Sequence, residues 1–131
     1  MERRWFFAAL LGSFGFVTGT AQSGNPDNRR IELLRTPLAG YPYYEADHAL
    51  PALKNGSALV LRREPENPFD RNAVEVLTED GIKLGYIPRT GVHSISRNLD
   101  RGIPVQCRVY EIQPDAGTWQ RIWLECYVNA G

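Results

Sequence analysis

Residues 57–87 read SALVLRREPENPFDRNAVEVLTEDGIKLGYI and contain three short apolar runs. The first run, 57–63, and the second, 73–77, flank a segment with two prolines. Each proline fixes φ and removes a backbone donor, so this segment is predicted to be an ordered loop. Asp-Gly at positions 80–81 is a typical hairpin turn, and the third run, 83–87, returns after it. The stretch therefore predicts three strands, joined by one long loop and one tight turn.

Further apolar runs lie on both sides of this stretch. Residues 30–38 predict a first strand, and residues 103–112 and 119–128 predict two longer strands joined by a polar turn. Residues 47–53 predict a short helical turn. Six strands of this length with mostly short links are typical of a small closed or nearly closed barrel. We therefore predict a mainly β fold, a six-stranded barrel with one or two short helices.

One clear helix is predicted between the fourth and fifth of these strands, 83–87 and 103–112. Val92, Ile95 and Leu99 stand at i, i+3 and i+7, which gives a helix one apolar stripe. Thr90 is the expected N-cap and Gly102 the expected stop.

The N-terminus carries the pattern of a secretory signal peptide. Residues 1–4 read MERR, residues 5–20 carry no charge, and small residues stand at positions 19 and 21. We expect cleavage after Ala21, so that 1–21 is a signal peptide, 22–29 a disordered leader and 30–129 the folded domain. The protein would then be exported, periplasmic or extracellular, with no stable membrane span after cleavage. The alternative is an N-terminal membrane anchor, for which the apolar stretch is short.

Composition limits the classes of function. The chain has 131 residues, 43% hydrophobic and 23% charged, which are ordinary values for one globular domain. Its formal net charge is zero, and removal of residues 1–21 leaves 13 basic and 14 acidic residues. A strongly basic coat for duplex DNA is therefore excluded. No GxxxxGK[ST] run is present, so nothing predicts nucleotide hydrolysis.

The two cysteines lie on the last two predicted strands. A hairpin centred between Ala116 and Gly117 places Cys107 and Cys126 directly opposite each other. In an oxidising compartment this pair is a possible disulfide, whereas the alternative is two buried thiols that act as small apolar side chains. A register slip of two residues would separate them. No CxxC or HxxxH spacing is present, so neither a metal site nor a cofactor is predicted.

Several spaced motifs resemble the HIRAN domain, a module at the N-terminus of some DNA-repair helicase-like translocases that also occurs alone in bacteria. They are LAGYPYY at 38–44, LVLRREPENPFDRNAVEV at 59–76 and GIKLGYIPR at 81–89. The run EPENPFDRNAV at 64–74 is the most specific of them. The resemblance covers about residues 31–128 and indicates a stand-alone HIRAN domain protein.

This resemblance implies an OB-like β-barrel that captures single-stranded DNA at a free 3′-hydroxyl end. By position, Tyr43 and Tyr44 match an aromatic pair that brackets the terminal nucleotides, and Phe69 and Asp70 match an aromatic and an acid near the terminal sugar. Two further positions that face the nucleic acid correspond to Tyr86 and Arg89. Pro42 stands where the DNA-binding relatives carry an arginine.

The residue types agree with such a ligand. Stacking a base on an aromatic ring contributes roughly 1–3 kcal/mol and tolerates any sequence. Guanidinium groups of Arg63, Arg71 and Arg89 match phosphate oxygens. Asp70 would accept a hydrogen bond from a terminal hydroxyl, or alternatively satisfy loop N–H groups only. The candidate nucleic-acid-binding residues are Tyr43, Tyr44, Arg63, Phe69, Asp70, Arg71, Tyr86 and Arg89.

The sequence also predicts which rings of two aromatic pairs are buried. Strand-like alternation would put one of Tyr43 and Tyr44 in the core and the other outside. Trp119 and Trp123 share one face of the last predicted strand and are interpreted as core or barrel-rim residues.

These observations favour a non-enzymatic module that binds single-stranded DNA, with preference for 3′-hydroxyl ends. The alternative is a secreted or envelope module that binds proteins or glycans and has lost DNA binding. An enzyme is not predicted, because the acids Glu64, Glu66 and Asp70 have no paired His, Cys or Ser nucleophile.

Overall fold

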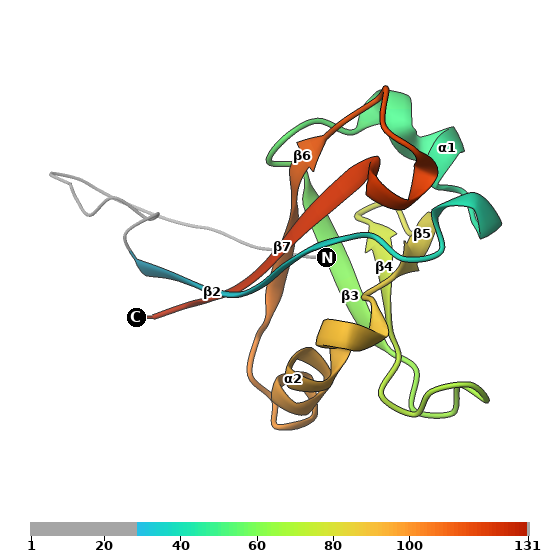
Figure 1. The fold of residues 1–131 in the computed structure, drawn as a ribbon. Helices are drawn as coiled ribbons and strands as arrows, with labels where there is room; N and C mark the ends of the chain where they lie inside the picture. The colour runs from blue at the N-terminus through green and yellow to red at the C-terminus, as the bar shows by residue number, and fades with distance from the viewer. Residues whose placement is uncertain (1–28, 131) are drawn as a thin grey trace, which may run out of the picture. The chain divides into compact units, whose positions relative to one another are not determined.

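The computed structural model describes residues 29–130, and residues 31–128 form one compact unit. Its centre is one six-stranded antiparallel sheet with the strand order β2-β7-β6-β3-β4-β5 (Figure 1). The strands are β2 (Arg30–Pro37), β3 (Ala58–Arg63), β4 (Val74–Thr78), β5 (Lys83–Tyr86), β6 (Gln106–Ile112) and β7 (Ile122–Asn129). The helices are α1 (Ala46–Ala49) and α2 (Arg89–Asp100), with short 3-10 turns η2 (Tyr41–Tyr43), η3 (Leu50–Ala52) and η4 (Thr118–Gln120).

The sheet curls until its two ends meet. Ala39, just after β2, forms an isolated antiparallel bridge with Tyr86 at the end of β5. Both hydrogen bonds of this bridge, N–H of each residue to the carbonyl of the other, are 2.9 Å long. Since β2 and β5 are the two outer strands of the sheet, this single bridge joins its ends into a nearly closed barrel. The prediction of a mainly β, six-stranded, OB-like fold with small helices is confirmed.

Gly85 permits this closure. A Cβ atom built on Gly85 would lie 2.1 Å from the carbonyl oxygen of Ala39. That distance is far inside van der Waals contact, and the opposing atom belongs to the backbone. The segments around Ala39 and Gly85 can therefore approach this closely only because Gly85 has no side chain.

Helix α2 packs one apolar face on the sheet. Val92 and Ile95 are buried and Leu99 packs against the same core, as the predicted stripe requires. The helix begins earlier than predicted, because Pro88 has the extended conformation of an N-cap and Thr90 already lies inside the helix. Thr90 is therefore not the N-cap.

Cys107 and Cys126 are direct partners across β6 and β7, in the register that the hairpin centre predicts. Both are buried free thiols in this structure. A hydrogen bond to Cys126, together with burial, raises the pKa of the Cys107 thiol well above its ordinary value. The thiolate, which is the reactive form, is therefore disfavoured at Cys107. Oxidation of the pair stays a prediction.

The predicted signal peptide, 1–21, lies outside the described residues, as does the predicted leader apart from Arg29. Among residues 29–130, none of the helices combines the length and the apolar character that a membrane crossing requires.

Candidate nucleic-acid interface

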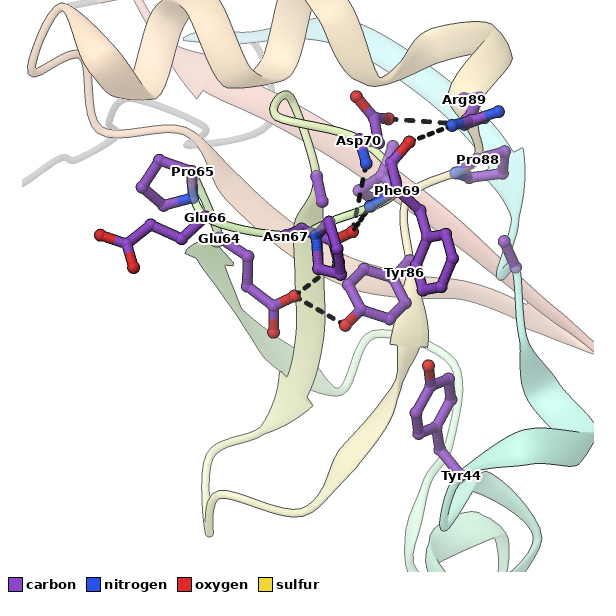
Figure 2. A pocket seen from close by; sticks show the side chains of 14 residues that line it. Tyr44, Glu64, Pro65, Glu66, Asn67, Phe69, Asp70, Tyr86, Pro88 and Arg89 are labelled. Atoms are coloured by element: carbon purple, nitrogen blue, oxygen red, sulfur yellow. Dashed lines mark hydrogen bonds and ion pairs between the residues drawn. The ribbon is translucent and has the colours of Figure 1, made fainter.

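A pocket of about 820 Å³ opens beside the loop that joins β3 to β4. The loop forms one wall, and the end of β5, the start of α2 and the segment after β2 form the others (Figure 2). The lining residues are Ala39, Tyr44, Glu64, Pro65, Glu66, Asn67, Pro68, Phe69, Asp70, Ala73, Tyr86, Ile87, Pro88 and Arg89. The segment that carries the sequence resemblance thus supplies most of this pocket.

The side chain of Asn67 organises the loop. Its Oδ1 accepts hydrogen bonds from the backbone N–H of Phe69 at 2.8 Å and of Asp70 at 3.1 Å. Its Nδ2 donates to Glu64 Oε1 at 3.0 Å. Asparagine commonly shapes a turn by bonding the backbone two residues ahead. As a result the ring of Phe69 projects from the loop, with 83% of the residue exposed.

Asp70 is held at the same edge of the pocket. Its Oδ1 accepts the backbone N–H of Asn72 at 2.9 Å, so the loop-shaping role considered for this carboxylate is present. Its Oδ2 lies 3.8 Å from Nε of Arg89, which is too long for a hydrogen bond. Arg89 also donates from Nη2 to the carbonyl of Phe69. The turn therefore occupies only one carboxylate oxygen of Asp70 with a short hydrogen bond.

A polar network supports the opposite wall. The hydroxyl of Tyr86 donates to Glu64 Oε1 at 2.7 Å and accepts from Lys83 Nζ at 2.6 Å. Lys83 Nζ also lies 4.4 Å from the ring centroid of Tyr44 and 4.3 Å from that of Tyr86. The two rings meet edge to face, with centroids 5.6 Å apart. These contacts fix the orientation of both tyrosines.

The network also fixes protonation states. Burial disfavours the charged form of Glu64, but hydrogen bonds from Asn67 and Tyr86 and the charge of Lys83 outweigh it and lower the pKa of Glu64. Burial raises the pKa of Tyr86, and its hydrogen bond to Glu64 adds to this effect. The pKa of Lys83 is raised, because its tyrosine and carboxylate neighbours outweigh burial. At neutral pH the wall therefore contains an ionised Glu64, a neutral Tyr86 and a charged Lys83.

Five of the eight candidate residues line the pocket together: Tyr44, Phe69, Asp70, Tyr86 and Arg89. Arg63 does not join them, because its side chain is only 17% exposed and its guanidinium binds Asp100 at 2.9 Å and the carbonyl of Ala73 at 2.9 Å. Arg71 is exposed on the loop but does not line the pocket.

Tyr43 also lies apart from the pocket, against Trp119. Tyr43 is 72% exposed, and its ring centroid is 6.4 Å from that of Trp119. The predicted alternation is wrong here, because these tyrosines lie in and after a 3-10 turn that follows Gly40 at φ 81°. Neither is a core residue, and Tyr41 is the buried ring instead.

Trp119 likewise is not in the core. It lies in η4, before β7 begins, and is 58% exposed. The prediction of a continuous strand over 119–128 did not include the turn η4.

Lys83 was missed by sequence reasoning. Strict strand alternation puts residues three apart on opposite faces, so Lys83 and Tyr86 were not expected together. The pairing of β4 with β5 shifts register between Val76 and Leu77. Leu84 and Gly85 are consequently both buried, while Lys83 and Tyr86 are both half-buried. Gly85 is the available sequence signal, because a glycine within a strand often marks an irregularity.

Comparisons with known proteins identify relatives of this chain. A family model described as the HIRAN domain matches residues 31–130. The helicase-like transcription factor of Oryctolagus cuniculus is 26% identical over 97 residues, which is 74% of this chain and 9% of that protein. The Fanconi-associated nuclease 1 homolog of Arabidopsis thaliana is 31% identical over 74 residues, 56% of this chain and 8% of that protein. The chain thus spans less than a tenth of the length of these relatives.

Solved structures share the fold. A crystal structure of a protein from Lactobacillus plantarum is similar with a TM-score of 0.66 and 27% identity, covering 75% of this chain and 93% of that one. The crystal structure of the HIRAN domain of human HLTF gives a TM-score of 0.57 and 20% identity, covering 76% and 78%.

Proposed function

The chain belongs to the HIRAN domain family, and on that premise we propose that it is a non-enzymatic module that binds single-stranded DNA and prefers a free 3′-hydroxyl end. One observation carries the proposal: exposed aromatic rings, a carboxylate and a guanidinium meet in one pocket. Stacking on rings such as Phe69 and Tyr44 would contribute roughly 1–3 kcal/mol per base without sequence preference.

Asp70 supports selection of an end. A carboxylate repels a phosphate, whereas it accepts a hydrogen bond from a hydroxyl. Within a continuing strand the 3′ oxygen carries a phosphate, and only at a terminus is it a free donor. Arg89, exposed beside Asp70, would contact the preceding phosphate.

The charge balance fits recognition of a few nucleotides. A chain with zero net charge does not attract nucleic acid through a large positive field. If the pocket meets one or two phosphates, the logarithmic dependence of affinity on salt should have a slope of only about −0.7 to −1.4. The names of the relatives, a helicase-like transcription factor and a nuclease, agree with a nucleic-acid ligand. Their activities are not assigned to this chain, which matches less than a tenth of either protein.

The test compares two labelled oligonucleotides of one sequence, one ending in a 3′-hydroxyl and the other in a 3′-phosphate. Fluorescence anisotropy with the purified protein should give about tenfold or tighter binding of the hydroxyl end, as expected for a hydrogen bond to a charged group. Equal binding would contradict end recognition but leave single-strand binding. Absence of binding to either would contradict the proposal and favour a protein or glycan ligand.

We also propose that the protein is exported and that its cysteines form a disulfide. The sequence of residues 1–21 supports export, and the direct pairing of Cys107 with Cys126 supports the bond. Intact mass spectrometry of the protein from the exported fraction should give a chain that begins at Gln22 and lacks the two thiol hydrogens. Alkylation of both cysteines in denaturant without reductant would contradict the disulfide, and an intact N-terminus would contradict cleavage.

A further inference from the structure

Helix α2 and its C-cap residue together carry four exposed side chains at every fourth position. These are Arg89, His93, Arg97 and Arg101, which we call the basic stripe. Residues four apart lie on one face of a helix, with a rise of about 6 Å between them. The stripe therefore presents a row of nitrogen-bearing side chains at nearly regular intervals, on a face that excludes the buried Val92 and Ile95.

Among residues 29–130, neither Arg97 nor Arg101 at the far end of this row forms an ion pair with an acid. Arg97 instead donates to Nε2 of His93 at 2.6 Å. The nearby Asp100 is engaged by Arg63, at 2.9 and 3.2 Å.

Helix stability explains only part of the stripe. Cations in the last turn interact favourably with the helix dipole, which accounts for Arg97 and Arg101. The same dipole disfavours a cation at the first turn, where Arg89 is the first residue of the helix. Arg97 and Arg101, four residues apart, also repel each other as like charges. Helix stability alone therefore does not account for arginines at both ends of one exposed face, and this arrangement indicates an anionic ligand.

Arg89 joins the basic stripe to the pocket. It lines the pocket, lies near Asp70 and donates to the carbonyl of Phe69 (Figure 2). We propose that the stripe binds the phosphates of the same DNA strand, upstream of the nucleotide held in the pocket. This inference rests on the proposed function. The spacing of the stripe is comparable to that of successive phosphates along one strand, so each step of four residues would serve about one phosphate.

The test is a length series of single-stranded oligonucleotides of two, four, six and eight nucleotides, all with a free 3′-hydroxyl. For the wild-type protein, affinity should rise with length as each added phosphate reaches the stripe. The double variant Arg97→Gln/Arg101→Gln should bind the dinucleotide normally but lose about tenfold in affinity for the octanucleotide at low salt. Its salt slope on the octanucleotide should become shallower by about 1.4, the value for two lost phosphate contacts on a single strand.

Lys54→Gln is the matched control, because it removes a positive charge from an exposed site outside the pocket and α2. It should keep the full length dependence. If the double variant loses affinity equally for the dinucleotide and the octanucleotide, the proposal that the stripe binds upstream phosphates is wrong. The same holds if its affinity depends on length as that of the wild-type protein does. Dinucleotide binding by the wild-type protein tests the proposed function separately. If the wild-type protein binds no oligonucleotide, both proposals fail.

Discussion

Replacing Gly85 with alanine is expected to destabilise the domain strongly. The new Cβ would lie 2.1 Å from the carbonyl oxygen of Ala39, and the side chain of Leu38 would be 3.2 Å away. Because the opposing atom belongs to the backbone, the clash can be relieved only if the segments around Ala39 and position 85 move apart. Separation would lengthen both hydrogen bonds of the Ala39–Tyr86 bridge. Overpacking and the weakened hydrogen bonds together should lower the free energy of unfolding by roughly 2–4 kcal/mol.

Urea unfolding measures this effect, with Gly117→Ala as the matched control. Gly117 has φ −60°, which alanine adopts readily, and a Cβ there meets nothing within 4 Å. The control should change the free energy of unfolding by no more than about 0.5 kcal/mol. If Gly85→Ala is as stable as the control, the two ends of the sheet do not approach as closely as the bridge requires.

Much of the fold was predictable because local patterns and tertiary structure agree. The alternating runs, the Asp-Gly turn and the apolar stripe at Val92, Ile95 and Leu99 each predict an element that the structure contains. The closing bridge was not predictable. It depends on contact between Ala39 and Tyr86, which are far apart in sequence, and on the single missing side chain at Gly85.

The candidate site divides in the same way. Phe69 and Asp70 were identified from one motif and Arg89 from the next motif along the chain, and the structure brings the three together at the pocket. Arg63 was proposed as a phosphate contact from its residue type alone, and its ion pair with Asp100, 37 residues away, could not be recognised from sequence. The burial of Tyr43 and Tyr44 was predicted wrongly because a 3-10 turn replaced the assumed strand period. Sequence reasoning was therefore least reliable where an irregular turn or a distant partner decides which way a side chain points.

Asp70→Asn is expected to abolish the preference for a hydroxyl end. Asparagine has nearly the same shape, and its Oδ1 can still accept the backbone N–H of Asn72, so the loop should keep its conformation. Only the charge is removed. A hydrogen bond to a charged group contributes about 1.5–3 kcal/mol against about 1 for a neutral pair, so binding of the 3′-hydroxyl oligonucleotide should weaken several-fold. Binding of the 3′-phosphate twin should strengthen at the same time, because the repulsion disappears.

The two changes act in opposite directions, so the ratio of the two affinities is the most sensitive measurement. Anisotropy titrations should show this ratio falling by roughly tenfold or more in Asp70→Asn. Asp115→Asn, the same chemical change on the exposed β6–β7 connection, should leave it unchanged. If Asp70→Asn keeps the wild-type ratio, the carboxylate serves the turn alone. End recognition would then have to come from other groups of the pocket, such as the ring of Phe69 or the guanidinium of Arg89.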